Sequence, residues 1–219
     1  MSHGRPHGAV PRGRVRIIGG SLRNSRLLVP DLDGLRPTPE RGRETVFNWL
    51  APVIAGARCL DLCAGTGALG VEALSRGAAS VTFVERDARV AQALRANLER
   101  LHAVGGEVSV AAAQDYLCGA AQTFDVVFVD PPFALDLWAD LARALEDGHW
   151  LAASALIYVE SPRATAPQLP AAWHVHREGF AGAVRLALYR RQAAASVKLE
   201  PATHSASGTG LAHLPRGMP

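Results

Sequence analysis

The chain has 219 residues, a formal net charge of +3 and 48% hydrophobic residues, enough for the core of one α/β domain. No apolar stretch reaches about 18 residues without a charge and no apolar segment follows the basic N-terminus, so we expect a cytoplasmic protein with no membrane span or secretory signal. Cys59, Cys63 and Cys118 lack paired C-x-x-C spacing and the histidines form no ligand motif, so we expect no disulfide frame and no metal site.

The charge is concentrated at the N-terminal end. Residues 1–43 hold nine arginines against Asp31, Asp33 and Glu40, a local charge of +6, so the remainder of the chain carries −3. Guanidinium groups match phosphate geometry, and a cluster of them favours nucleic acid as a partner. A solvated basic terminus is the alternative, and it is the better explanation for any single arginine.

The N-terminal elements are predicted first. Residues 1–13 are expected to form a disordered basic arm. The segments 15–18 and 27–29 indicate a β-hairpin closed through Gly19 and Gly20, and a helix is expected from about Glu40 to Leu50. Together they define an N-terminal unit, residues 14–52, which we interpret as a lid for RNA and cofactor.

Strands and helices then alternate through a domain predicted to span residues 53–192. This rhythm predicts a Rossmann-like, doubly wound and mainly parallel sheet that ends in an antiparallel hairpin near 173–180 and 184–189. Residues 193–219, rich in Ala, Ser, Gly and Pro, are expected to be a disordered tail. The expected strands are 58–62, 80–85, 107–111, 124–129 and 154–160, and the expected helices are 68–76, 87–101, 115–120 and 136–146.

A glycine-rich loop follows the first of these strands. Gly65 and Gly67 permit positive φ and close approach of a ligand, and Gly70 permits tight packing of the helix on the sheet. Glu85 ends the next strand, where an acid can bind two ribose hydroxyls. The pattern also fits G-x-G-x-x-G, so a dinucleotide enzyme is a serious alternative.

Asp61 argues against the dinucleotide. A carboxylate four residues before Gly65 would repel a pyrophosphate at the helix start, whereas it would attract a cation. S-adenosylmethionine carries an ammonium and a sulfonium, has no phosphate, and still offers a ribose to Glu85. Helix capping by Asp61 and a solvated strand end at Glu85 are the structural alternatives.

The tetrad Asp130, Pro131, Pro132 and Phe133 follows the apolar strand 124–129. Because ligands bind beyond the carboxyl ends of parallel strands, the Asp130 carboxylate and nearby carbonyls are expected to face a site. Neither proline has an N–H, so the group favours a substrate that brings donors, such as an exocyclic amine, with Phe133 as a stacking surface. A strand-ending turn is the alternative.

These residues resemble one family. From about residue 14 to 192 the chain is similar to the RsmD-type bacterial methyltransferases, through RIIGGSLR at 16–23, LRPTPERGRETVFNWL at 35–50, LDLCAGTGALGVEALSRGA at 60–78, VERD at 84–87 and DPPF at 130–133. Pro39 and Gly42 depart from the family pattern, and the segments before Arg14 and after Gln192 lie outside it.

The resemblance implies a function and a set of roles. The family transfers a methyl group from S-adenosylmethionine to the exocyclic N2 of one guanine in 16S ribosomal RNA of the small ribosomal subunit, without a metal. It implies that Asp61, Gly65 and Gly67 bind the methionine moiety, Glu85 the ribose and Asp115 the adenine amine. Asp130 and Pro131 would accept hydrogens from N2, and Phe133 would stack on the base. We expect a monomer whose leading phosphate contacts are Arg16, Arg23, Arg36, Arg41 and Arg43.

Three other functions stay open. The same tetrad serves methyltransferases of DNA or of protein amines. An NAD-dependent oxidoreductase would make no use of residues 130–133 and would tolerate Asp61→Ala. A non-catalytic RNA-binding assembly factor would survive Asp130→Ala. Asp115 has a further structural alternative, as the N-cap of the helix that follows it.

Overall fold

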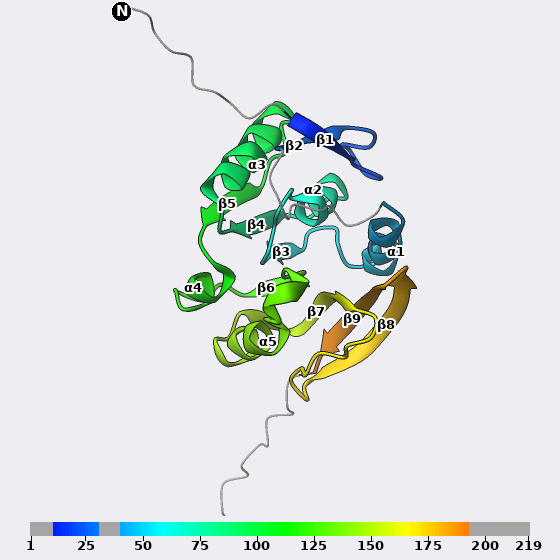
Figure 1. Cartoon of the computed structure of the whole chain (residues 1–219), viewed down its shortest axis with the longest axis vertical. Helices are drawn as coiled ribbons and strands as arrows, with labels where there is room; N and C mark the ends of the chain where they lie inside the picture. Colours follow the sequence, from blue (N-terminus) through cyan, green and yellow to red (C-terminus); the bar gives the residue numbers. More distant parts are fainter. Residues whose placement is uncertain (1–10, 31–39, 193–219) are drawn as a thin grey trace, which may run out of the picture.

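The computed structural model describes residues 11–30 and 40–192 (Figure 1). A two-stranded antiparallel sheet of β1 (Pro11–Arg16) and β2 (Arg26–Pro30) comes first, followed by α1 (Glu40–Leu50). β1 therefore begins inside the arm predicted for residues 1–13, because Pro11 and Gly13 already pair with β2. Residues 1–10, the predicted tail 193–219, and Arg36 with Pro39 lie outside the described residues.

Strands and helices alternate after α1 as expected. The strands are β3 (Arg58–Asp61), β4 (Ser80–Glu85), β5 (Gly106–Val110), β6 (Phe124–Val129), β7 (Leu151–Pro162), β8 (Trp173–Ala181) and β9 (Val184–Arg191). The helices are α2 (Ala68–Ser75), α3 (Ala88–Arg100), α4 (Ala113–Leu117) and α5 (Trp138–Asp147), with the short 3₁₀ helix η1 (Phe133–Leu135) before α5.

One seven-stranded sheet carries the fold, in the order β5-β4-β3-β6-β7-β9-β8. Strands β3 to β7 are parallel, and β9 pairs antiparallel with both β7 and β8. The predicted fold class is therefore confirmed. The order changes direction at β3, so the carboxyl ends of β3 and β6 lie at a topological switch point, where open α/β sheets bind their ligands.

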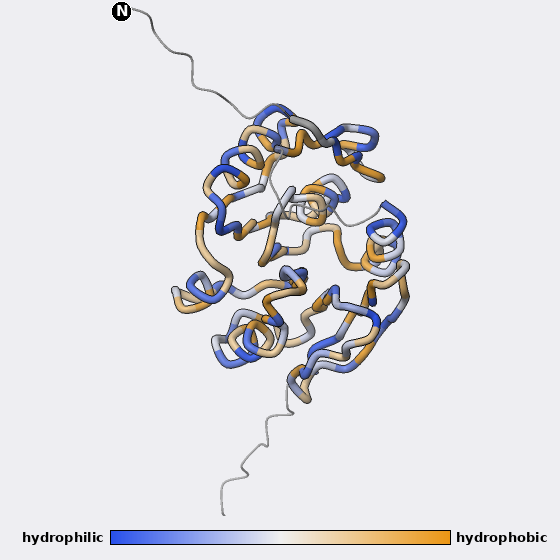
Figure 2. The backbone as a smooth tube through the Cα atoms, in the orientation of Figure 1, coloured by the Kyte–Doolittle hydropathy of each residue, from blue (hydrophilic) through white to orange (hydrophobic). Residues whose placement is uncertain are grey.

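The sheet has a hydrophobic core on each face. Phe83 and Phe128 pack toward α1, α2 and α3, whereas Val127 and Trp138 belong to the core on the side of α4 and α5. Figure 2 shows the hydrophobic residues along the central strands and on the helix sides that face them. Because strand side chains alternate between faces, the face on which a strand-end residue lies is fixed by its register.

The β1–β2 hairpin is hydrogen-bonded to helices α2 and α3, which pack on the seven-stranded sheet. Glu72, in the middle of α2 and 0% exposed, accepts hydrogen bonds from the backbone N–H groups of Ile18 and Gly19, both at 2.8 Å. Asn97 of α3 bonds both the N–H and the carbonyl of Leu28, each at 2.9 Å. The buried polar side chains of Glu72 and Asn97 therefore attach the hairpin to helices α2 and α3.

Within residues 11–30 and 40–192, no helix has the length and apolar character that a membrane crossing requires.

Candidate active site

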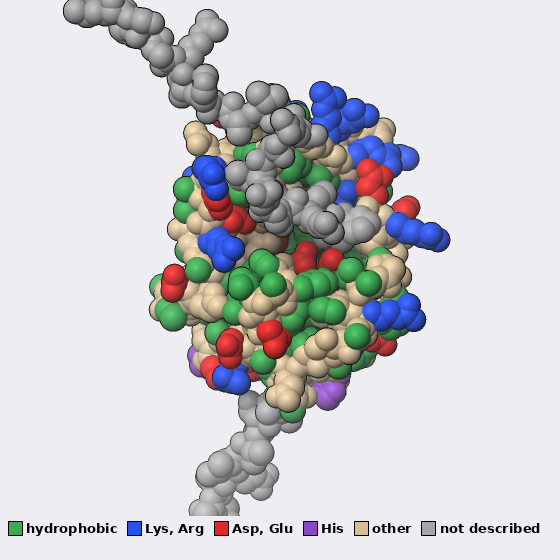
Figure 3. All heavy atoms as spheres, in the orientation of Figure 1, with side chains coloured by type: hydrophobic (Ala, Val, Ile, Leu, Met, Phe, Trp, Pro, Cys, Tyr) green, Lys and Arg blue, Asp and Glu red, His purple; other side chains and the backbone are tan. Residues whose placement is uncertain are grey.

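Acidic side chains end three neighbouring strands of the sheet. Asp61 is the last residue of β3, Glu85 the last of β4, and Asp130 follows β6. Asp61 pairs with Phe83 on β4 and Phe128 on β6, so Glu85 and Asp130 lie two residues further along, about 6.6 Å beyond it, on the same face. The structure therefore brings together the three acids predicted from sequence, with Asp61 the deepest. Figure 3 shows acidic side chains near the middle of this face, bordered by hydrophobic ones.

Glu85 shapes the glycine loop. One carboxylate oxygen accepts the N–H of Gly65 at 2.9 Å, and the other accepts the N–H of Asp87 at 2.8 Å. Gly65 and Gly67 have φ of 51° and 76°, the left-handed region that glycine adopts without strain. The carboxylate is therefore held at the mouth of the loop before any ligand arrives, and each oxygen keeps acceptor capacity for a hydroxyl.

Asp61 is 2% exposed and accepts the N–H of Gly70 at 3.0 Å. Gly70 is in the first turn of α2, so Asp61 caps this helix from the end of β3. The N-cap residue itself is Gly67. The pKa of Asp61 is raised to about 7, mainly by burial and also by the nearby Glu85 carboxylate, although the Gly70 hydrogen bond lowers it. A ligand cation beside Asp61 would favour its ionised form and offset that cost.

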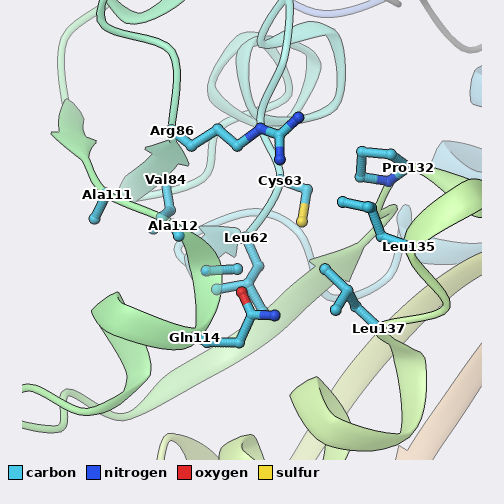
Figure 4. Close-up of a pocket in the computed structure, with 11 residues that line it drawn as sticks. Leu62, Cys63, Val84, Arg86, Ala111, Ala112, Gln114, Pro132, Leu135 and Leu137 are labelled. Carbon is cyan, nitrogen blue, oxygen red and sulfur yellow. The ribbon is translucent and has the colours of Figure 1, made fainter.

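A pocket of about 280 Å³ opens beyond β3, β4 and β5 (Figure 4). Its walls are largely apolar, and the Gln114 amide, the Cys63 thiol and the Arg86 guanidinium are its polar side chains. Such a slot suits a flat heterocycle with polar edges. The lining residues are Leu62, Cys63, Val84, Arg86, Ala111, Ala112, Ala113, Gln114, Pro132, Leu135 and Leu137.

Asp115 is not among these residues. It is exposed at the third position of α4, whose N-cap is Ala112, so the capping alternative is wrong, while the adenine contact stays a prediction. The neighbouring Gln114 lines the pocket instead. The helix expected to start at residue 115 starts two residues earlier, at Ala113, and this places Gln114 and Asp115 next to each other in its first turn.

The Cys63 side chain lines the pocket and is not activated as a nucleophile. Burial raises its pKa to about 12, and the carboxylates of Asp61, Asp130 and Glu85 raise it further. The thiol therefore stays protonated at neutral pH.

The Asp-Pro-Pro-Phe segment turns sharply out of the sheet. Asp130 is half-buried, Pro131 is buried, and the Phe133 ring is 38% exposed. Pro132 O accepts the N–H of Leu135 at 3.0 Å, which closes the 3₁₀ turn, and Phe133 lies 5.6 Å from the Trp138 ring. A ring that is packed along one side and exposed on another is suited to stacking on a planar ligand.

Comparison with known proteins agrees with this geometry. The family described as Conserved hypothetical protein 95 matches residues 15–190. A relative from Escherichia coli named ribosomal RNA small subunit methyltransferase D is 51% identical over 182 residues, which cover 83% of this chain and 92% of the relative. The chain belongs to the RsmD-type family.

Two further members support the assignment. The relative of the same name from Haemophilus influenzae is 42% identical over 82% of this chain and 95% of its own. The solved structure of the Escherichia coli yhhF protein superposes with a TM-score of 0.77 at 51% identity, covering 83% of this chain and all of that one. The sequence resemblance of this RsmD-type protein is thereby confirmed over residues 15–190.

The predicted RNA-binding arginines of this family member have different surroundings. Arg23 lies exposed in the hairpin turn, and Arg41 is exposed on α1. Arg16 is 45% exposed and pairs with Glu40 at 2.6 Å, which raises the pKa of Arg16 and lowers that of Glu40. These three remain candidates for phosphate contacts, and Figure 3 shows basic side chains at the edge of the molecule near β1 and β2.

Arg43 is not available to RNA, which corrects one prediction. Its side chain is 1% exposed, its guanidinium lies 3.6 Å from Glu72, and it donates to the Arg16 carbonyl at 3.0 Å. A signal for this was present, because Arg43 shares the i, i+3, i+4, i+7 stripe of Val46, Phe47 and Leu50. Arg43 therefore fastens α1 to the hairpin and α2.

A fourth acid, Glu160, lies on β7 next to Asp130 and was not singled out in the sequence analysis. It follows the apolar run Leu156–Val159 of β7, as Glu85 and Asp130 follow their own strands. The same signal could have found it. Across the described ranges, no group of three or more His, Cys, Asp or Glu side chains is arranged to hold a metal ion.

Proposed function

We propose that this protein transfers a methyl group from S-adenosylmethionine to the exocyclic N2 of a guanine in 16S ribosomal RNA. The observation that carries the proposal is the position of Asp130 to Phe133 at the switch point, directly beside the Asp61 and Glu85 loop, in a chain whose close relatives are named ribosomal RNA small subunit methyltransferases.

The cofactor half of the site fits S-adenosylmethionine. The largely apolar pocket between Leu62, Val84 and Leu137 suits the adenine, with the Gln114 amide at its edge. Glu85 at the glycine loop suits the ribose, and the buried Asp61 carboxylate suits the cationic methionine end. When bound, S-adenosylmethionine supplies a methyl group on a sulfonium, which is already a strong leaving group.

The protein must then position the guanine N2 amine relative to the methyl group. Asp130 and the Pro131 carbonyl accept the two hydrogens of guanine N2, which turns its lone pair away from the ring system, and Phe133 stacks on the base. The new C–N bond forms as the C–S bond breaks, and the electron pair of that bond stays with sulfur. The nitrogen becomes cationic, so the Asp130 carboxylate stabilises the charge that develops in the transition state. The extra proton leaves N2 afterwards, because a carboxylate cannot usefully deprotonate a neutral aromatic amine beforehand.

Arg16, Arg23 and Arg41 supply contacts to RNA phosphates, and the target guanine must be unstacked or already exposed to reach Phe133. The expected substrate is the small subunit or its 16S RNA, consistent with the names of the relatives.

The test uses radiolabelled S-adenosylmethionine with small-subunit particles assembled without native base methylation, beside naked 16S RNA. The label is mapped by nucleoside mass analysis. Asp130→Asn is the test variant, and Asp147→Asn, an exposed acid at the end of α5, is the matched control.

Label on guanine N2 with wild type and Asp147→Asn, but not with Asp130→Asn, is the expected result. Absence of transfer to both RNAs, although the cofactor binds, would overturn the RNA assignment and direct attention to DNA and protein amines. Label on another base or on the ribose would refute the role of Asp130 at N2.

A further inference from the structure

Strands β7, β9 and β8 lie next to one another at one end of the sheet (Figure 1), and they extend past the point where β6 ends. Val129, the last residue of β6, pairs with Val159 of β7. β7 then continues for three more residues to Pro162, and β9 and β8 pair alongside it over that length. At about 3.3 Å per residue, these strand ends reach about 10 Å beyond β6. Residues 160–163 and 180–185 therefore form a ridge beside the Asp-Pro-Pro-Phe tetrad, on the carboxyl edge of the sheet.

The ridge carries an exposed aromatic ring with a cation over it. Phe180 of β8 is 51% exposed, and the guanidinium carbon of Arg163 lies 4.6 Å from the centre of its ring. The Arg163 N–H donates to the Ala183 carbonyl at 2.8 Å, which attaches the segment after β7 to the β8–β9 turn. The ring and the guanidinium are therefore held together before any ligand arrives.

Phe180 lies on the same side of the sheet as Phe133. Phe180 pairs with Arg185 of β9, and directly opposite residues of paired strands share a face. Arg185 and Ala187 are two residues apart, so both face the core that contains Trp138, the residue that Phe133 contacts. Three strand spacings, roughly 14 Å, separate β6 from β8. A few nucleotides of single-stranded RNA can cover this distance.

Arg163 has no carboxylate partner within the described residues, in contrast to two arginines of β9. Arg185 pairs with Glu178, and Arg191 pairs with Glu146. Figure 3 shows basic side chains in this part of the molecule, near β8 and β9. A lone exposed phenylalanine is common on protein surfaces. A half-exposed ring beside an unpaired guanidinium, however, combines the two groups that bind single-stranded nucleic acid, a stacking surface for bases and a cation for phosphate.

We propose that Phe180 and Arg163 form a second RNA contact, in which the ring stacks on an unpaired base near the target guanine and the guanidinium binds a phosphate of the same strand. This inference rests on the proposed function and adds a flanking nucleotide to its substrate. Phe133 and Phe180 are then two stacking surfaces on one side of the sheet. The protein selects RNA that is single-stranded next to the target guanine.

The test measures RNA binding and methylation separately, with small-subunit particles assembled without native base methylation. The dissociation constant of the particle is measured by filter binding, KM and kcat with radiolabelled S-adenosylmethionine, and cofactor affinity by calorimetry. Phe180→Leu removes the ring but keeps an apolar side chain, whereas Phe180→Tyr keeps the ring. Arg163→Gln removes the charge.

We expect Phe180→Leu to raise the dissociation constant and the KM of the particle about tenfold, with kcat nearly unchanged, because stacking on a base is lost. Phe180→Tyr should stay within about twofold of wild type, since every aromatic ring can stack. Arg163→Gln should weaken binding a few-fold and reduce the slope of log affinity against log salt concentration by about 0.7. Cofactor affinity should not change. Unchanged particle binding in Phe180→Leu, or equal losses in Phe180→Leu and Phe180→Tyr, would overturn the proposal.

Two control variants lie at the opposite end of the same strands. Val175, on the same face of β8, is 56% exposed and pairs with Tyr189, and Arg190 is exposed on β9. Val175→Ala and Arg190→Gln should both bind the particle like wild type, and losses equal to those of the ridge variants would refute a localised contact. Thermal unfolding is measured for every variant. If Phe180→Leu does not fold, the salt dependence of Arg163→Gln decides, and an unchanged slope would refute the phosphate contact.

Failure of the proposed function gives a different result. Wild type would then not label guanine at all, whereas guanine labelling with unchanged particle binding in Phe180→Leu and Arg163→Gln refutes only the second RNA contact.

Discussion

The cofactor half and the substrate half of the candidate site are held in place by different kinds of contact. In the cofactor half, Asp61 and Glu85 accept backbone N–H groups of the glycine loop and α2. In the substrate half, the turn after Asp130 is closed by the Leu135 N–H, which donates to the Pro132 carbonyl, and the Phe133 ring packs on Trp138. Backbone hydrogen bonds fix Asp61 and Glu85 as soon as the sheet and α2 form, whereas the substrate half depends on a contact between the Phe133 and Trp138 side chains, which belong to η1 and α5. The cofactor half should therefore tolerate changes in the substrate half.

The largest effect is expected from Asp130→Asn. The amide cannot stabilise positive charge on N2, so kcat should fall by about 10²- to 10³-fold. The dissociation constant for S-adenosylmethionine, measured by calorimetry, should stay within about twofold because Asp61 and Glu85 are untouched. A parallel loss of cofactor binding would show that the halves are not separable.

Glu72→Gln tests whether the attachment of the hairpin and α1 to α2 is electrostatic. Glu72 is 0% exposed and lies 2.8 Å from Arg76 and 3.6 Å from Arg43, so the substitution removes the carboxylate charge that faces the buried Arg43 and the partly buried Arg76. The free energy of unfolding in urea should fall by about 3 kcal/mol. Glu99→Gln, exposed on α3, should change it by less than about 0.5 kcal/mol.

Asp61 should make cofactor affinity depend on pH. Because burial raises its pKa to about 7, the folded protein holds this proton more tightly than the unfolded chain, and the unliganded protein loses stability as pH rises from about 4 to 7. A cationic ligand prefers the ionised form, so binding should strengthen by up to about tenfold per pH unit below 7 and then level off.

Calorimetry between pH 5.5 and 7.5 measures this dependence in buffers of different ionisation enthalpy, which also count the released proton. Asp61→Asn should bind more weakly at pH 7.5 and show a nearly flat profile. An equally steep pH dependence of cofactor affinity in Asp61→Asn would mean that another group releases the proton on binding.

The smallest effect belongs to the hairpin arginines. Arg23→Ala should weaken RNA binding a few-fold and reduce the slope of log affinity against log salt concentration by about 0.7–0.9. Cofactor binding should not change. Arg190→Ala, exposed on β9, is the matched control, and an equal change in slope there would mean that the basic surface is not localised.

The parts of the site that could be predicted from the sequence are those that depend on local sequence patterns. The glycine loop and the Asp-Pro-Pro-Phe tetrad are local patterns, and the alternation of apolar strands with helices placed them on the correct strand ends. The burial of Arg43 depended on helix phase, and the place of Gln114 in the pocket wall on a two-residue helix boundary, which composition does not determine. The acid after the apolar run of β7, Glu160, was visible in the sequence, but its position beside Asp130 is set by the register of β7 with β6.

The loop that carries the tetrad is anchored at both of its ends. It leaves β6 at Asp130, and it re-enters regular structure at Trp138, whose indole N–H binds the Glu160 carbonyl of β7. A designer who moved residues 130–137 into another methyltransferase to change its base preference would transfer the segment without its second attachment. Such a graft should include Trp138 and the end of β7, so the transferable unit for engineering is a loop together with the neighbouring strand.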